Sequence, residues 1–197
     1  MIMAGVKSVE LFKKVYSAEE DFPDDRPQVA FVGRSNVGKS TLLNSIFNRR
    51  MAETSSTPGK TRTLDFYLVN GKFYIVDLPG YGYMKISKKE QKRIAKLVEH
   101  YLKSSTKLEY IFILMDARHP AQKKDAELLE YLNFFRLHKA VVLTKIDKLP
   151  RSRRREIFTE HERFLRIFGE YTLFPTSAVT REGLKELVNF IFLIIKG

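Results

Sequence analysis

A segment near residue 33 has the residue types that bind phosphate groups. It follows the pattern G-x-x-x-x-G-K-[ST], comes after a short apolar run at residues 29–32 and precedes residues with helical spacing. The glycines let backbone N–H groups turn toward phosphate oxygens, and the start of the following helix adds positive potential. We expect the ammonium of Lys39 to reach the β- and γ-phosphates and the hydroxyl of Ser40 to bind Mg²⁺. The predicted phosphate contacts are Gly33, Arg34, Ser35, Asn36, Val37, Gly38, Lys39, Ser40 and Thr41.

A second segment that suits phosphate chemistry consists of Asp77, Leu78, Pro79 and Gly80, which follow the apolar run at residues 73–76. A carboxylate at the carboxyl end of a strand can hold the ligand shell of Mg²⁺, and the N–H of Gly80 can meet a γ-phosphate. On its own this pattern is a common turn. Its position 44 residues after Gly33 favours the functional interpretation.

A third segment, Thr144, Lys145, Ile146 and Asp147, follows the apolar run at residues 140–143 and predicts a site for a nucleotide base. Guanine presents two adjacent N–H donors that one carboxylate can accept, whereas adenine has no such pair. We therefore expect Asp147 to select guanine. The aliphatic stem of Lys145 could cover one face of the ring. The alternative is a charged turn before a proline.

A fourth and weaker signal is the tripeptide Ser177, Ala178 and Val179, which closes the run at residues 172–176. A backbone N–H there could donate to O6 of guanine, where adenine carries an amino group. All four segments follow predicted strands. They would therefore meet at the carboxyl edge of one sheet, where open α/β sheets bind their ligands.

The elements that must position these segments alternate along the chain. Short apolar runs predict strands at residues 29–32, 73–76, 110–115, 140–143 and 172–176. Helical spacing of apolar residues predicts helices around residues 42–47, 94–101, 128–135, 157–168 and 184–195. Asn70-Gly71 favours a tight turn between residues 63–69 and 73–76, and hence one antiparallel pair. We predict an α/β fold of the P-loop NTPase class, a doubly wound, mostly parallel sheet with one antiparallel edge strand and helices on both faces.

Composition limits the function further. The 197 residues, 44% of them hydrophobic, predict one globular domain. Because the motifs begin near residue 28, we expect a GTP-binding domain at residues 28–197, with residues 1–27 as an extension packed on it. Whether residues 8–16 form a strand or a short helix stays open. The absence of cysteine excludes a disulfide framework and thiolate metal sites. No apolar run reaches the length of a membrane span, and no secretory signal is present, so we expect a cytoplasmic protein.

The net charge of +12 favours a polyanionic partner, with nucleic acid first among the candidates. The stretch from Lys85 to Lys107, directly after the second segment, contains eight basic residues and only two acidic ones. A second cluster contains Arg151, Arg153, Arg154 and Arg155, where positive charge opposes the dipole of the predicted helix. The phosphates of a nucleic acid would bind such surfaces with salt-dependent affinity. The alternative is an ordinary solvated face in a lysine-rich chain.

The four segments, in this order, resemble the translation-factor class of P-loop GTPases. Residues 56–63 (STPGKTRT), 77–83 (DLPGYGY) and 116–120 (DARHP) resemble, more narrowly, the EngB/YihA/YsxC family of bacterial ribosome-biogenesis GTPases. The resemblance implies that GTP and GDP bind with Mg²⁺, and that Thr61 is a second magnesium ligand beside Ser40. It also implies a role in large-subunit assembly and in normal septation. The nucleotide contacts that it adds are Gly59, Lys60, Thr61, Arg62 and Thr63.

Two departures from the general GTPase pattern bear on activity. Thr144 replaces the usual asparagine, so the bracing role of that amide must be reduced or reassigned. Tyr81 stands where signalling GTPases have the glutamine that orients the attacking water, so we expect slow intrinsic hydrolysis by a site built on Lys39, Thr61 and Gly80. Asn36 could help to hold K⁺ near the phosphates, or it could be a simple spacer.

The leading hypothesis is a monomeric GTP-dependent switch that binds the large ribosomal subunit or its precursor through rRNA, without specificity for DNA. A passive RNA-binding chaperone would bind ribosomes regardless of nucleotide. An ATP-dependent kinase or ATPase is disfavoured by Asp147. A membrane-anchored septation factor is disfavoured because the sequence has neither a lipidation motif nor a spanning helix.

Overall fold

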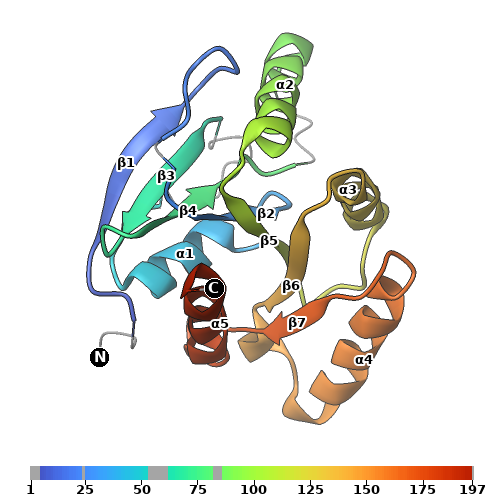
Figure 1. Ribbon diagram of the computed structural model, residues 1–197. Coiled ribbons are helices and arrows are strands. Elements are labelled where there is room, and N and C mark those ends of the chain that lie inside the picture. Colours follow the sequence, from blue (N-terminus) through green and yellow to red (C-terminus); the bar gives the residue numbers. More distant parts are fainter. Residues whose placement is uncertain (1–4, 24, 53–61, 82–85, 197) are drawn as a thin grey trace.

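The computed structural model describes residues 5–23, 25–52, 62–81 and 86–196 of the chain. Within these residues a seven-stranded sheet forms the centre of the molecule, in the order β1-β3-β4-β2-β5-β6-β7 (Figure 1). The strands are β1 (Val9–Val15), β2 (Gln28–Gly33), β3 (Leu64–Val69), β4 (Phe73–Asp77), β5 (Leu108–Asp116), β6 (His138–Thr144) and β7 (Thr172–Pro175). The described helices are α1 (Lys39–Phe47), α2 (Lys88–Ser104), α3 (Lys123–Asn133), α4 (Arg154–Leu165) and α5 (Leu184–Lys196), with short 3₁₀ turns at Ile146–Lys148 and Arg151–Arg153.

The helices cover both faces of the sheet, as the hydrophobic pattern predicts. Strand β5 is buried on both sides because its alternate residues belong to two different cores. Ile111 and Ile113 pack with residues of α2, α3 and α4, whereas Phe112 and Leu114 pack with residues of α1 and α5. The predicted fold class is thus confirmed, including the position of residues 110–115 in a central parallel strand.

The antiparallel edge is also confirmed, and the N-terminal segment enlarges it. Strands β3 and β4 pair antiparallel across the turn at Asn70 and Gly71, both of which have positive φ angles. Strand β1 then pairs antiparallel with β3, so residues 8–16 contribute a strand and not a helix. The register of β1 shifts between Leu11 and Lys13, and the Leu11 and Phe12 side chains are exposed.

The parallel strands carry their carboxyl ends to one edge of the sheet, and all four sequence segments begin there. Strand β2 leads into residues 33–41, β4 into residues 77–80, β6 into residues 144–147 and β7 into residues 177–179. None of the described helices is long and apolar enough to cross a lipid bilayer.

Candidate nucleotide site

The loop between β2 and α1 has the backbone geometry of a phosphate cradle. Gly33 allows a close approach, because an added Cβ would lie 2.8 Å from a Val37 side-chain carbon and 2.9 Å from Cβ of Leu114. Asn36 and Gly38 have φ angles of 62° and 101°, which turn the loop into the first turn of α1. The N–H groups of a first helical turn have no acceptor within the helix. They are available to an anion at this point.

Lys39 and Asp77 form a buried ion pair at the base of this cradle. Lys39 begins α1, and Asp77 ends β4, so the pair joins the first two sequence segments. Burial raises the pKa of the Asp77 carboxyl, and the Lys39 ammonium counteracts part of that rise. A buried charge left alone is costly, so each of these groups requires either its present partner or a replacement. A phosphate group could replace Asp77 as the partner of Lys39, and a cation could replace Lys39 as the partner of Asp77.

A separate hollow of about 210 Å³ lies beside the cradle and contains residues of the first, third and fourth segments. Asp147 is largely buried there, and its Oδ1 accepts a hydrogen bond from the Ser177 hydroxyl at 2.7 Å. The Ser177 hydroxyl oxygen in turn accepts hydrogen bonds from the backbone N–H groups of Val179 and Thr180. This chain of bonds fixes the carboxylate of Asp147. The residues around the hollow are Gly38, Thr41, Leu42, Thr144, Lys145, Asp147, Lys148, Ala178 and Val179.

Lys145 lies between this hollow and the cradle in a constrained conformation. Its φ angle is 62°, a left-handed value that is uncommon for a residue with a side chain. Its ammonium donates to the Asn36 carbonyl at 2.7 Å and pairs with Asp116 at 2.8 Å. Although burial raises the pKa of Asp116, hydrogen bonds from Arg118 and Lys145 lower it to about 2. Asp116 therefore stays ionised and holds both cations in place.

Thr144 takes over the bracing role that the sequence left open. Its buried hydroxyl lies 2.6 Å from the carbonyl oxygen of Val37, to which it can donate. The bond joins the end of β6 to the phosphate loop across 107 residues of sequence. A hydroxyl thus provides a link between the two segments without the amide of an asparagine.

Tyr81 is joined to α3 and to the phosphate loop by hydrogen bonds. Its hydroxyl donates to Asp125 of α3 at 2.8 Å, and its backbone N–H donates to the Gly33 carbonyl. Burial raises the pKa of the Tyr81 phenol, and the neighbouring Asp125 carboxylate adds to that rise, so the hydroxyl remains a donor. Sequence analysis did not identify Asp125. Its capping position at the start of α3 was the only available signal.

The predicted switch residues are only partly covered by the structure. Gly59, Lys60 and Thr61 lie outside the described residues, so the expectation that Thr61 binds Mg²⁺ stays a prediction. Arg62 and Thr63 precede β3, where the Arg62 carbonyl accepts from Arg93 and the Thr63 hydroxyl lies 2.5 Å from Asp65. The remaining predicted residues, from Gly33 to Thr41, Asp77 to Gly80, Thr144 to Asp147 and Ser177 to Val179, lie at the carboxyl edge of the sheet. Their roles as nucleotide contacts also stay predictions.

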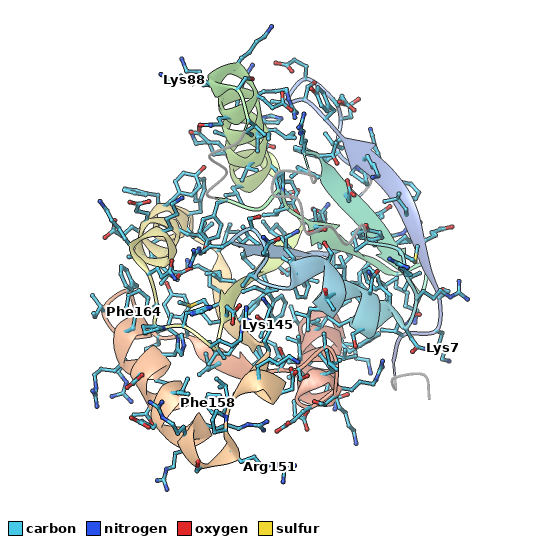
Figure 2. All side chains as sticks on the ribbon, turned by 180° about the vertical axis from the view of Figure 1, so that it is seen from behind. Lys7, Lys88, Lys145, Arg151, Phe158 and Phe164 are labelled. Carbon is cyan, nitrogen blue, oxygen red and sulfur yellow. The ribbon has the colours of Figure 1, made fainter. Side chains whose placement is uncertain are left out.

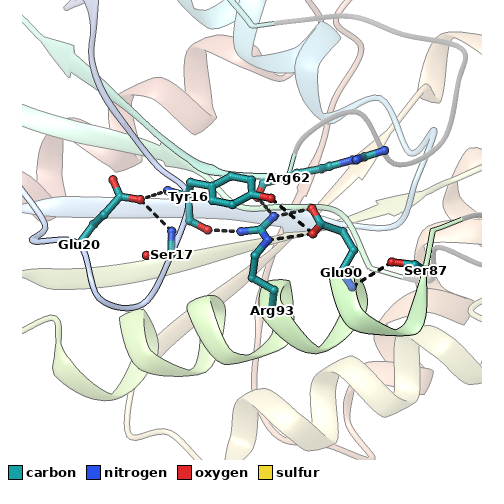
Figure 3. Close-up of polar contacts among 7 residues, drawn as sticks. All are labelled: Tyr16, Ser17, Glu20, Arg62, Ser87, Glu90 and Arg93. Atoms are coloured by element: carbon teal, nitrogen blue, oxygen red, sulfur yellow. Dashed lines mark hydrogen bonds and ion pairs between the residues drawn. The ribbon is translucent and has the colours of Figure 1, made fainter.

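Arg93 of α2 joins Arg62 to the N-terminal segment (Figure 3). Its guanidinium donates to the carbonyls of Arg62 and Tyr16, pairs with Glu90 at 2.7 Å, and lies 3.5 Å from the centre of the Tyr16 ring. Glu20 accepts hydrogen bonds from the backbone N–H groups of residues 16 and 17 and fixes that turn. Arg93 is therefore a structural residue, not a free cation of the basic surface.

Replacing Arg93 with alanine should lower the melting temperature of the nucleotide-free chain by about 4 °C, because several hydrogen bonds to a charged group are lost together. Lys96→Ala is the matched control on the same helix. Lys96 pairs with Glu19 at the surface, where ion pairs contribute little, so we expect a change below about 1 °C. Scanning calorimetry measures both values. Equal shifts for the two variants would show that the Arg93 contacts do not stabilise the fold.

Comparisons with known proteins all find GTPases or GTP-binding proteins. A family model described as "50S ribosome-binding GTPase" matches residues 28–145. A probable GTP-binding protein EngB from Thermotoga maritima is 47% identical over 97% of this chain and 98% of its own length. A crystal structure of a probable GTP-binding protein engB superposes with a TM-score of 0.69 at 23% identity, covering 86% of this chain and 98% of that one.

A second similar structure holds a nucleotide and an RNA fragment. Era, in complex with MgGDPNP and nucleotides 1506–1542 of 16S ribosomal RNA, has a TM-score of 0.68 and 25% identity to this chain. The match covers 84% of this chain and 55% of Era.

Proposed function

Since this chain belongs to the EngB family of GTP-binding proteins and is a GTPase, we propose that it acts as a nucleotide-dependent switch in assembly of the large ribosomal subunit. One observation carries the nucleotide part of the proposal: the phosphate cradle lies beside a hollow in which hydrogen bonds fix a carboxylate. Lys39 lies at the first and Asp147 at the second. A guanosine nucleotide has matching groups at its two ends, a polyphosphate and a pair of N–H donors.

We propose that Lys39 leaves Asp77 when nucleotide binds and reaches the β- and γ-phosphates, while the amides of the cradle surround the phosphate oxygens. The vacated Asp77 carboxylate and the Ser40 hydroxyl are oxygen donors of the kind that Mg²⁺ prefers, and Thr61 is proposed as a further ligand. Bound Mg²⁺ would neutralise charge that develops on the phosphates. Lys39 would stabilise in-line attack of water on the γ-phosphate, with the Gly80 N–H as an additional donor.

Intrinsic hydrolysis is proposed to be slow because the Tyr81 hydroxyl is held by Asp125 and cannot orient water. If Asn36 helps to bind K⁺ beside the phosphates, turnover should be about tenfold faster in KCl than in NaCl at equal ionic strength. Phosphate release at saturating GTP measures this ratio. Equal rates in the two salts would remove K⁺ from the account.

We propose that the partner is the large ribosomal subunit or its precursor, contacted through rRNA at the basic face of α2. Lys88, Lys89 and Lys92 are exposed, and among the described residues they form no ion pair. Arg93 is left out of this surface because its guanidinium is engaged. Era provides support by analogy, since that GTPase is bound to ribosomal RNA in its complex.

Replacing Lys88, Lys89 and Lys92 with alanine should weaken binding to large-subunit particles about tenfold at 0.1 M salt and reduce the salt slope by about 2. A control variant removes the same charge elsewhere, at the exposed residues Lys72, Lys185 and Lys196. Sedimentation with the particles across a salt series measures both. If the two triple variants lose affinity equally, the effect belongs to net charge and not to the face of α2.

The same sedimentation assay tests the switch itself. We expect the wild-type chain to bind large-subunit particles more tightly with a non-hydrolysable GTP analogue than with GDP or without nucleotide. Indifference to nucleotide would favour the second candidate, a passive RNA-binding chaperone. The proposal extends to a monomer that acts in the cytoplasm and contributes to normal septation, without specificity for DNA. Residues 28–197 would act as the GTP-binding domain and residues 1–27 as an extension packed on it.

A further inference from the structure

A second hollow, of about 700 Å³, lies beside the nucleotide site. One wall is the loop of residues 117–121 after β5, and the other is a single face of α4 with the turn before it. The α4 side contributes Arg153, Ile157, His161 and Phe164, whose spacing follows the helical repeat. The proposed switch mechanism uses neither wall. The loop belongs to the segment at residues 116–120 whose chemistry the sequence analysis left unexplained.

The lining of this hollow combines an apolar floor with a basic rim. Ile157 and Phe164 contribute apolar surface, and Ile167 continues it at the edge with 76% of its surface exposed. Arginine side chains come from both walls, Arg118 from the loop and Arg163 from the helix. Single-stranded RNA is bound in this way, with bases on aromatic or apolar side chains and phosphates on cations.

Arg163 and Arg153 are available to a ligand, whereas Arg118 is paired with Asp116. Arg163 forms no ion pair or side-chain hydrogen bond within the part of the chain that the structure describes. Arg153 pairs with Glu156 at the surface, with about 60% of both side chains exposed, and such pairs exchange partners at little cost. The opposing carboxylate in the lining is Glu160, so positive charge prevails.

A buried polar atom provides a second, independent observation. His161 also lines the hollow and is only 3% exposed, and its Nδ1 atom has no hydrogen-bond partner among the described residues. Burial lowers the pKa of the His161 ring. Buried polar atoms are nearly always satisfied, so Nδ1 of His161 is a place where a ligand group or a water molecule could supply the missing partner.

We propose that this hollow receives one unstacked nucleotide of single-stranded RNA, with its base against Phe164 and its phosphates on Arg163, Arg153 and Arg118. The inference rests on the proposed function and specifies how the rRNA partner would be held. In Figure 2, Phe164 lies on α4, far from Lys88 at the outer end of α2. The hollow would therefore be an RNA contact separate from the basic face of α2.

The hollow is connected to the nucleotide site by a short series of contacts. Arg118 donates to Asp116 at 2.8 and 2.9 Å, Asp116 pairs with Lys145, and Lys145 donates to the Asn36 carbonyl in the phosphate loop. An RNA phosphate that draws Arg118 away from Asp116 would leave Lys145 as the remaining cation on that carboxylate. RNA binding and nucleotide binding would then affect each other by the same factor.

The test compares Arg163 of α4 with Arg166, the residue that directly follows this helix. Arg163 lines the hollow, whereas Arg166, three residues further on, lies outside it at the surface. We expect Arg163→Gln to weaken the binding of a fluorescent single-stranded RNA octamer to the GDP-bound full chain about fivefold and to lower the salt slope by about 1. Arg166→Gln should change affinity less than twofold. Equal affinities of the two variants would overturn the proposal.

Crosslinking decides where the RNA lies. The same octamer with 4-thiouridine at each position in turn should crosslink to residues 117–121 or to Ile157, Phe164 or Ile167. Crosslinks confined to α2 would overturn the hollow as an RNA site, even if wild-type chain still binds large-subunit particles in a nucleotide-dependent manner and the proposed switch stands. If wild-type chain does not bind the particles at all, the proposed function fails, and the rRNA role of the hollow fails with it.

Discussion

Replacing Asp147 with asparagine is expected to lower the affinity for GDP by about 100-fold and to create affinity for xanthosine diphosphate. The carboxylate can accept from both N–H donors of guanine, and the loss of charge-assisted hydrogen bonds in a partly buried site costs about 3 kcal/mol. The amide of asparagine meets the ring N–H with its oxygen and the additional carbonyl of xanthine with its NH₂ group. The fold should persist, because the Asn oxygen can still accept from the Ser177 hydroxyl.

Titration calorimetry with both nucleotides measures the switch in specificity. Glu170→Gln serves as the control, since it neutralises an exposed carboxylate that does not line this hollow. We expect that control to bind GDP as the wild-type chain does. Unchanged GDP affinity in the Asp147 variant would remove this residue as the base selector and would reopen the alternative of an ATP-dependent enzyme.

Replacing Lys39 with alanine is expected to abolish detectable binding of GDP and GTP, a loss of more than about 1,000-fold. In the proposed complex the Lys39 ammonium contacts both the β- and the γ-phosphate. The same change leaves Asp77 buried without its partner, which should destabilise the nucleotide-free fold by about 3 kcal/mol. A binding defect could therefore reflect an unfolded chain.

The double variant Lys39→Ala/Asp77→Asn separates the two effects. It removes the unpaired carboxylate, so calorimetric stability should recover toward that of the wild-type chain while nucleotide binding remains absent. Tight GDP binding by a folded Lys39→Ala variant would contradict the interpretation of residues 33–41 as the phosphate cradle.

Much of this fold could be predicted from the sequence because its signals are local. Short apolar runs of strand length gave the strands, and the spacing of residues such as Leu128, Leu129 and Leu132 gave the helices. Strand β1 could not be assigned in this way. Its register shift between Leu11 and Lys13 interrupts the alternation of buried and exposed residues. The hydrophobic pattern therefore shows neither the two-residue repeat of a strand nor the 3.6-residue repeat of a helix.

The candidate site shows the same division between local and long-range information. The motifs predicted which backbone segments meet, because each follows a parallel strand. They did not predict the hydroxyl of Thr144 on the Val37 carbonyl, or that of Tyr81 on Asp125, since these bonds join residues far apart in sequence. The count of charges between Lys85 and Lys107 places Arg93 in a basic surface, because such a count does not identify the partners that cover a side chain.

The central claim is that one guanosine nucleotide spans the phosphate cradle and the hollow at Asp147. A crystal structure of the chain with a non-hydrolysable GTP analogue and Mg²⁺ tests it most directly. The account predicts guanine N1–H and N2–H₂ on the Asp147 carboxylate, and the Lys39 ammonium moved from Asp77 to the phosphates. An analogue bound elsewhere, with Lys39 still paired to Asp77 and the hollow closed by Lys145 or Val179, would contradict it.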